Sequence, residues 1–298
     1  MAAAAAENAG TPQTRPRPIR LGRLVLEWGR RTYIMGVLNV TPDSFSGDGV
    51  TDLAAAGALA RDMVEQGADI IDIGGESTRP GAVPVPIPEE LRRVIPVVEA
   101  ITGELGVPIS VDTRRAEVAR HALQAGAAMV NDVSALRSDP EMAAVVAEAE
   151  VPVVLMHGYG MTRAEAEEHE ESDIIVDIAS FLHERTALAA GAGISRDHIL
   201  IDPGFGFGKT VRQNLELLRR LQELQVLGRP IVIGTSRKGT IGRVLGGLPP
   251  TDRMEGTAAT VAASILHGAD VVRVHDVKSM ARVARMTDAI ARELGDNG

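Results

Sequence analysis

The 298-residue chain contains no cysteine and no long hydrophobic run. Without cysteine it cannot form a disulfide, a thiolate metal site or a thiol nucleophile. No stretch approaches the roughly 18 to 20 consecutive apolar residues of a membrane span, and the N-terminus lacks the basic and apolar regions of a signal peptide. These absences predict a cytoplasmic protein that has no membrane partner.

Positive charge is also in short supply. The formal net charge is -9, which argues against broad electrostatic binding to nucleic acid or to an anionic membrane. An anionic ligand must therefore find a local cluster of basic side chains. The composition is 45% apolar and 24% charged, as in ordinary globular proteins.

The first 18 residues differ from the rest of the chain. They open with an alanine-rich stretch and continue with alternating arginine and proline, which offer little to pack. We expect residues 1–18 to form a disordered N-terminal tail. The remaining residues, 19–298, suit a single domain, because an eight-fold barrel uses roughly 250 residues.

Short β-branched runs alternate with longer helical patterns from Tyr33 to the end, as in repeated βαβ units. Eight strands are expected to end near Leu38, Ile73, Val111, Val130, Leu155, Ile201, Ile233 and Val274. Helices are expected between them, for example over residues 53–66, 89–105, 116–125, 141–150 and 214–224. This pattern predicts an α/β fold, a (β/α)8 or TIM barrel, although an open doubly wound sheet has the same alternation.

Two local features support repeated units. Gly67, Gly126 and Gly268 each precede an apolar run by a few residues, as expected for a glycine that ends a helix before the next strand. Residues 19–26 precede the first barrel strand, and we expect them to form a short hairpin that covers the barrel floor.

Polar residues follow almost every predicted strand. In a barrel these positions converge on one mouth, where active sites lie. Asp112, Asn131 and Asp202 would bring three hydrogen-bond acceptors into that mouth. Burying acceptors is costly unless something donates to them, and a ring edge with several N–H groups would do so.

Basic side chains and a histidine stand at other strand ends. Arg79, Lys238, Arg273 and His275 predict an anion site, since the loops after the last two strands of barrels often bind phosphate. Other polar residues have a simpler interpretation. We expect Arg237 and Arg243 to be solvated surface charges. Thr113, Ser134 and Asp276 are expected to cap the helices that follow them.

Some apparent motifs fail on spacing. Gly208-Lys209-Thr210 ends like a Walker phosphate loop, but Pro203 stands where that motif requires glycine. No dinucleotide fingerprint is present. The histidines at positions 157, 169, 183 and 198 do not have zinc-ligand spacing, so structural or surface roles are expected for them.

Taken together, the strand-end motifs resemble those of dihydropteroate synthases. The resemblance is carried by residues 39–46, 76–81, 202–209, 236–238 and 273–275, which occur in the family's order. Two positions depart from the family pattern. Gly239 replaces a frequent serine, and the acidic residue of the first loop comes one place later, at Asp48.

The resemblance implies the condensation of 6-hydroxymethyl-7,8-dihydropterin diphosphate with 4-aminobenzoate, with Mg²⁺ as cofactor, in a homodimer. It implies that Asp112, Asn131, Asp202 and Lys238 hold the pterin, and that Asp112, Lys238 and Arg273 are catalytic. The diphosphate would be held by Thr78, Arg79, Arg273 and His275, and by Asn39 through the metal. Phe45, Pro80 and Phe207 would form the aminobenzoate slot.

Two other functions share parts of this pattern. A pterin-binding methyltransferase has the barrel and the acidic residues but needs no diphosphate cluster, so the basic strand ends count against it. A catalytically silent pterin-binding paralogue is the second alternative, and Gly239 with the shifted Asp48 is the evidence for it.

Overall fold

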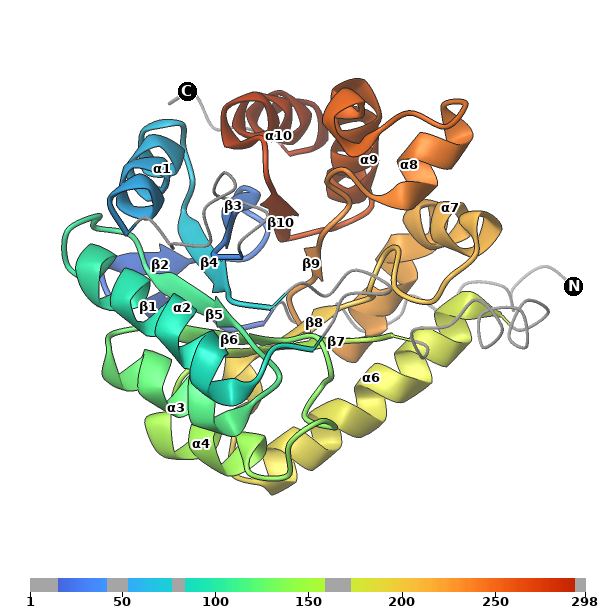
Figure 1. The fold of residues 1–298 in the computed structure, drawn as a ribbon. Helices are drawn as coiled ribbons and strands as arrows, with labels where there is room; N and C mark the ends of the chain where they lie inside the picture. Colours follow the sequence, from blue (N-terminus) through green and yellow to red (C-terminus); the bar gives the residue numbers. More distant parts are fainter. Residues whose placement is uncertain (1–15, 42–52, 77–83, 159–172, 293–298) are drawn as a thin grey trace, which may run out of the picture.

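The computed structural model describes residues 16–41, 53–76, 84–158 and 173–292. A parallel sheet stands at the centre of the molecule, and helices surround it (Figure 1). Its strands are β3 (Tyr33–Asn39), β4 (Ile70–Gly74), β5 (Ile109–Asp112), β6 (Met129–Asp132), β7 (Val153–Met156), β8 (Ile199–Asp202), β9 (Val232–Ile233) and β10 (Val271–Val274). Each predicted strand end lies within two residues of the observed one.

The α-helices described outside the sheet alternate with its strands. They are α1 (Leu53–Glu65), α2 (Ile87–Ile101), α3 (Ala116–Gln124), α4 (Met142–Ala149), α6 (Ile174–Gly191), α7 (Val211–Arg220), α8 (Gly239–Val244), α9 (Met254–Leu266) and α10 (Val277–Ala291). Short 3₁₀ turns are η1 (Arg196–His198), η2 (Leu221–Leu227) and η3 (Pro250–Asp252).

Helix α7 begins three residues before its predicted start at Asn214. The Thr210 side chain accepts a hydrogen bond from the Gln213 backbone N–H, and the Gln213 side chain accepts one from the Thr210 backbone. This reciprocal cap fixes the first turn of the helix. The observed α-helix ends at Arg220, before the predicted end at residue 224, because residues 221–227 form the 3₁₀ segment η2.

The sheet is a closed barrel. Strands pair in the order β8-β7-β6-β5-β4-β3-β10-β9. The two outer members meet through a parallel bridge between Ile201 and Ile231, and Ile201 N donates to the Pro230 carbonyl at 3.0 Å. The barrel prediction is therefore confirmed, and an open doubly wound sheet is excluded.

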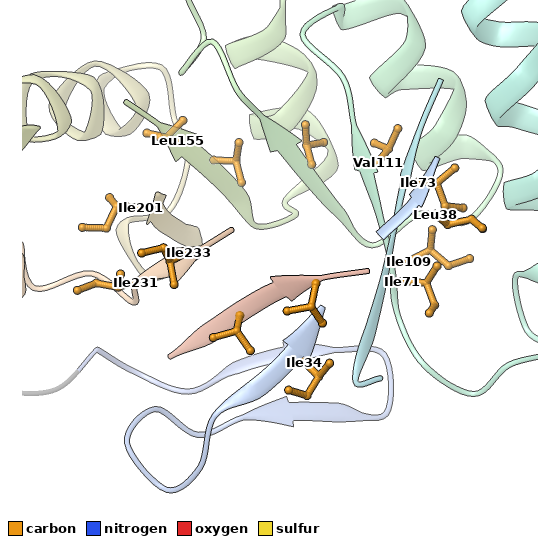
Figure 2. Close-up of a cluster of buried hydrophobic side chains, with 14 of the residues drawn as sticks. Ile34, Leu38, Ile71, Ile73, Ile109, Val111, Leu155, Ile201, Ile231 and Ile233 are labelled. Carbon is orange, nitrogen blue, oxygen red and sulfur yellow. The ribbon is translucent and has the colours of Figure 1, made fainter. Parts of the chain in front are cut away.

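Side chains that point outward from the strands form the larger apolar core. Figure 2 shows part of it, from Ile34 and Leu38 on β3 round to Ile233 on β9. Helix residues such as Val94 and Leu182 belong to the same cluster. Because successive strand residues face opposite sides, this packing leaves the alternate residues to fill the barrel interior.

The barrel interior at the strand starts is apolar, and a hairpin covers it. Strands β1 (Ile19–Leu21) and β2 (Leu24–Leu26) pair antiparallel. Their buried residues share one cluster with Met35, Val154 and other residues from the strand starts. Trp28 belongs to this cluster, and its ring meets the Tyr33 ring edge-on at a centroid distance of 5.9 Å. The predicted hairpin at the barrel floor is confirmed.

Residues 1–15 of the predicted tail lie outside the described residues, so its disorder stays a prediction. Just before the hairpin, the Arg17 carbonyl accepts a hydrogen bond from Trp28 Nε1 at 2.9 Å. Among the described residues, no helix is both long enough and apolar enough to cross a membrane.

The predicted helix-to-strand turns are confirmed. Gly67, Gly126 and Gly268 have φ angles of 105°, 111° and 95°. A residue with a Cβ rarely adopts such values, so glycine allows each helix to end and the next strand to begin without strain.

Candidate active site

A cavity of about 410 Å³ lies at the C-terminal ends of the barrel strands. The predicted site residues that line it are Asn39, Asp112, Asn131, Asp202, Phe207, Lys238, Arg273 and His275. The structure thus brings together side chains from six strand ends and the loops that follow them. Phe45, Thr78, Arg79 and Pro80 fall outside the described residues.

Arg273 organises the base of this cavity. Its Nε donates to Asp72 Oδ2 at 2.6 Å, and its Nη2 donates to Asp112 Oδ2 at 2.6 Å. Asn131 Nδ2 also donates to Asp72 Oδ2, at 3.0 Å. One guanidinium therefore bridges two carboxylates, and the charge of Arg273 is shared between them.

Asp72 is a residue that the sequence analysis missed. It is fully buried in the middle of β4, and it pairs in register with Val37 and Ser110. The signal in the sequence is an acidic residue inside the apolar run Ile70 to Ile73. Aspartate is almost never fully buried unless it is paired, so its position alone indicates a partner.

Burial disfavours the ionised forms of the two aspartates at the base, Asp112 and Asp202. Burial raises the pKa of Asp112 to about 7, against the opposing charge of Arg273, and the nearby Asp72 carboxylate raises it further. Burial also raises the pKa of Asp202, while a 2.7 Å hydrogen bond from Gly204 N and the charges of Lys238 and Lys209 lower it. Ligand N–H donors at this base would favour the charged carboxylates.

The loop after β8 carries Phe207 to the cavity. Gly204 has a φ of 67°, and a Cβ there would lie 1.8 Å from the His157 carbonyl oxygen, so only glycine fits. Gly206 N donates to Asn214 Oδ1 at 2.7 Å, which ties the loop to α7. Lys238 Nζ lies 3.9 Å from the centre of the Phe207 ring. This cation–π contact couples the β8 loop to the β9 loop.

Lys209 binds backbone carbonyls of the same loop. Its Nζ donates to the carbonyls of Gly204 at 2.9 Å, His157 at 3.3 Å and Phe207 at 3.4 Å. Burial lowers the pKa of Lys209 to about 7, although the Asp202 charge opposes this. The rejected Walker-like motif therefore contains a residue that organises the site, a role that its spacing could not reveal.

His275 contributes hydrogen bonds rather than charge. Its Nδ1 lies 3.0 Å from Ser236 Oγ, and its backbone N donates to the same hydroxyl at 3.2 Å. Burial lowers the pKa of His275 to about 3, and the positive charges of Arg273 and Arg237 lower it further. The imidazole is consequently neutral near pH 7 in the ligand-free protein.

The prediction that Arg237 is a solvated surface charge is wrong. The side chain is half-buried and lines the cavity, and its Nε and Nη2 donate to the Asp276 carboxylate at 2.9 and 2.5 Å. Its carbonyl accepts a hydrogen bond from Arg253 Nη1 at 2.8 Å. Arg243 is exposed, as predicted, although it also lines the cavity.

The three predicted helix caps are also wrong, because none of these side chains caps the helix that follows it. Asp276 begins α10 but makes no side-chain cap, since its carboxylate binds Arg237. Thr113 Oγ1 donates to Glu90 Oε1 at 2.7 Å, and the N-cap of α3 is Arg115.

Ser134 likewise turns away from the helix that it was expected to cap. Its Oγ donates to Asp132 Oδ1 at 2.7 Å, and α4 begins only at Met142 with Glu141 as N-cap. The Asp132 carboxylate also accepts hydrogen bonds from the backbone N–H groups of Ser134 and Leu136. These bonds shape the loop after β6.

Within the described ranges, no group of three or more histidine, aspartate or glutamate side chains is placed to hold a metal ion. Asn39 offers one half-buried amide at the end of β3, on the cavity wall. Mg²⁺ commonly takes one or two protein oxygens and completes its shell with water and substrate phosphates. The donor set therefore fits a magnesium ion that binds together with a diphosphate.

Fold and cavity define the chain as a TIM-barrel enzyme that places acceptors at the base of its site and cations on its walls. The sequence matches the family of pterin binding enzymes over residues 35–275, from β3 to the end of β10. The chain belongs to this family and, within it, to the dihydropteroate synthases.

Similar proteins support this assignment. The chain is 48% identical to the dihydropteroate synthase of Synechocystis sp., across 93% of this chain and 96% of that protein. It is 50% identical to the Bacillus subtilis dihydropteroate synthase, across 91% and 92%. A crystal structure of the Clostridium difficile enzyme in the presence of pteroic acid has a TM-score of 0.84 at 51% identity, covering 90% of this chain and 99% of that one.

A structure of Xanthomonas albilineans dihydropteroate synthase with 4-aminobenzoic acid also has a TM-score of 0.84, at 45% identity, covering 91% of this chain and 96% of that one. Family membership assigns this chain the family's reaction. It condenses 6-hydroxymethyl-7,8-dihydropterin diphosphate with 4-aminobenzoate to give 7,8-dihydropteroate and diphosphate in folate synthesis.

Proposed function

We propose that the base of the cavity binds the pterin ring through Asp112, Asn131, Asp202 and Lys238. The observation that carries this proposal is that three acceptor side chains, each no more than 8% exposed, line one cavity of about 410 Å³. A pterin edge supplies several N–H donors in one plane. Such donors offset the cost of burying the acceptors.

The diphosphate is proposed to lie toward Arg273 and His275. Arg273 keeps N–H groups beyond the two that bind Asp72 and Asp112, since a guanidinium has five. His275, neutral in the free protein, can donate one hydrogen bond to a phosphate oxygen. Roles for Thr78 and Arg79 in diphosphate binding stay predictions from the family resemblance.

Asn39 is proposed to hold Mg²⁺ through its side-chain oxygen. When bound, the ion would neutralise charge on the departing diphosphate. The two side chains proposed to face the diphosphate, Arg273 and His275, are held by Asp72 and by Ser236. They can therefore stabilise developing negative charge without rearranging.

The 4-aminobenzoate ring is proposed to bind beside Phe207, with Phe45 and Pro80 completing the slot as the resemblance implies. In the reaction, the amine nitrogen bonds to the pterin methylene carbon as the bond from that carbon to the diphosphate oxygen breaks. The diphosphate leaves with the electron pair, and the amine loses one proton. Asp112, when ionised, stabilises the positive charge that develops on the pterin.

Little acid–base catalysis is required, because an aromatic amine is already neutral near pH 7. Rate acceleration then depends on holding the two substrates in line and on stabilising the leaving group. This agrees with a site in which the buried residues are tied to each other rather than to a general base.

Calorimetry tests the binding proposal and the silent-paralogue alternative together. The protein should bind the pterin diphosphate, and it should bind 4-aminobenzoate only when diphosphate and Mg²⁺ are present. A silent module would bind the pterin ligand and never 4-aminobenzoate. Lys278→Ala, an exposed change on α10, should behave like the wild type. The methyltransferase alternative is disfavoured by the identity to the synthases.

We further propose a cytoplasmic homodimer that assembles through barrel helices. Large apolar side chains on α9 and its neighbour α8 support a partner surface: Val244 is 53% exposed and Leu266 is 52% exposed. Light scattering after size exclusion should give twice the chain mass of 31.5 kDa. A monomer at micromolar concentration would contradict the dimer.

A further inference from the structure

Asp72 lies beneath the proposed pterin site without lining the cavity. It is fully buried and accepts hydrogen bonds from two residues that do line the cavity, Arg273 and Asn131. Both bonds go to one oxygen, Oδ2. Among the described residues, its second oxygen, Oδ1, has no hydrogen-bond partner.

The bond from Asn131 fixes the orientation of an amide that could otherwise flip. A carboxylate only accepts hydrogen bonds, so the Asn131 NH₂ group must face Asp72. The remaining polar atom of that side chain is the carbonyl oxygen Oδ1. Asn131 is therefore set to present an acceptor to the cavity.

The bond from Arg273 fixes a guanidinium in the same way. Asp72 and Asp112 occupy Nε and Nη2, which sets the plane of the group and leaves its other N–H groups for a ligand. The bonds to Asp72 and Asp112 are charge-assisted and short, both at 2.6 Å.

We infer that Asp72 is a positioning residue, which sets the pattern of donors and acceptors that the cavity offers to the pterin ring. The inference rests on the proposed function of the cavity. Asp72 touches no substrate and acts through Asn131 and Arg273. Its loss should therefore weaken recognition of the pterin more than recognition of 4-aminobenzoate.

The first test is Asp72→Asn, which keeps the shape of the side chain. A neutral amide can either donate to or accept from Asn131, so it no longer imposes one orientation. We expect Kd and KM for the pterin diphosphate to rise at least about tenfold, as for loss of a charge-assisted hydrogen bond. KM for 4-aminobenzoate should change less than about threefold.

Ser110→Ala is the matched control. Ser110 faces Asp72 in register and is fully buried, and within the described part of the chain its hydroxyl has no hydrogen-bond partner. It does not line the cavity. A general disturbance of the barrel interior would affect both variants, whereas the inference predicts wild-type constants for Ser110→Ala.

The decisive test exchanges the carboxylate of Asp72 and the amide of Asn131. Asn131→Asp alone sets two carboxylates against each other and should also weaken pterin binding at least about tenfold. The double variant Asp72→Asn, Asn131→Asp restores one donor and one acceptor, and it still presents an oxygen to the cavity. Its Kd for the pterin diphosphate should return to within about fivefold of the wild type.

Circular dichroism and thermal unfolding establish which variants fold. If a single variant does not fold, the folded double variant is compared with the wild type, and loss of binding overturns the inference. The inference is also overturned if the Kd of the double variant rises by the product of the two single-variant factors or more. Wild-type constants for Asp72→Asn overturn it as well. Failure of the wild type to bind the pterin diphosphate contradicts the proposed function instead.

Discussion

At the scale of single residues, the site depends on how the buried carboxylates at its base are paired with cations. Arg273 contacts both Asp72 and Asp112, and Asp202 lies on the same cavity wall. One guanidinium is thus shared by Asp72 and Asp112, while the charges of Lys238 and Lys209 act on Asp202. These buried carboxylates favour a ligand that brings hydrogen-bond donors and tolerates a positive charge in the transition state.

Replacing either of two residues proposed to bind the pterin should therefore slow the reaction. We expect Lys238→Ala and Asp112→Asn to lower kcat/KM by about 10² or more, because each loses an electrostatic interaction with the transition state. Steady-state kinetics with both substrates measure this, with Lys278→Ala as the control. Near-wild-type turnover in both variants would remove these residues from the site.

Asp112 also makes stability depend on pH. Its pKa is about 7 in the folded protein and 3.8 for the ordinary group, so the folded state holds its proton more tightly. The stability that this proton provides is complete below pH 3.8 and is lost as the pH rises to about 7. Asp112→Asn cannot lose a proton there.

Denaturant unfolding between pH 4 and pH 8 checks this sign. The free energy of unfolding of the wild type, relative to that of Asp112→Asn, should fall as the pH rises through this window. A relative stability that rises, or stays constant, would show that Asp112 is ionised throughout.

The sequence predicted the residues at strand ends but not the residues that hold them. Asp112, Asn131 and Asp202 could be found because strand ends in a barrel converge. Asp72 could not be assigned a partner, since its contact with Arg273 spans 201 residues and exists only after closure. The cap predictions for Thr113 and Asp276 failed for a related reason, because the partners of these side chains, Glu90 and Arg237, lie on other elements of the fold.

At the scale of elements, the loop after β8 is the most constrained part of the site. Three of its glycines, at positions 204, 206 and 208, have positive φ angles, and Lys209 binds the carbonyls of Gly204 and Phe207. The loop therefore presents Phe207 as a fixed surface for Lys238.

Gly204→Ala tests this constraint. Its new Cβ would meet the His157 carbonyl oxygen at 1.8 Å with φ at 67°, so β7 and the β8 loop must separate. We expect the free energy of unfolding to fall by about 2 to 4 kcal/mol, together with a large loss of activity.

Gly228→Ala is the comparison, since its φ is 61° but nothing lies within 4 Å of the added carbon. It should cost about 1 kcal/mol through backbone strain alone and leave kcat/KM unchanged. Equal effects of the two substitutions, measured by denaturant unfolding, would mean that the close approach to His157 contributes nothing.

Element positions were largely predictable, because β-branched runs and helix-ending glycines are local signals. The start of α7 was not, since the capping pair Thr210 and Gln213 stands before the apolar pattern that marks the helix. The motif that contains Lys209 was correctly rejected as a Walker loop, but the sequence could not show which carbonyls the ammonium binds.

At the scale of the whole molecule, the barrel places the apolar residues that stabilise its floor and the residues of the proposed site at opposite ends. The apolar floor, plugged by the hairpin and Trp28, lies at the strand starts, while the cavity lies at the strand ends. The bridge between Ile201 and Ile231 joins the two outer strands, β8 and β9, and closes the sheet into one cylinder. The alternation of strands and helices predicted the units, and only this contact distinguishes a barrel from an open sheet.

Trp28→Ala tests the separation. Trp28 is 6% exposed, and truncating a buried aromatic side chain costs about 3 to 5 kcal/mol. We expect that loss in denaturant unfolding, with kcat/KM within about threefold of the wild type while the protein stays folded. Val226→Ala, at a side chain 66% exposed, should change stability by no more than about 0.5 kcal/mol. A large rise in KM for Trp28→Ala would contradict this separation.

The central claim is that one cavity joins the two substrates and releases diphosphate. A coupled assay of diphosphate release by the wild-type protein measures this most directly, with the pterin diphosphate, 4-aminobenzoate and Mg²⁺ supplied together and then omitted one at a time. We predict release only when all three are present, with one dihydropteroate formed for each diphosphate. Release that continues without 4-aminobenzoate, or no release from the complete mixture, would contradict the claim.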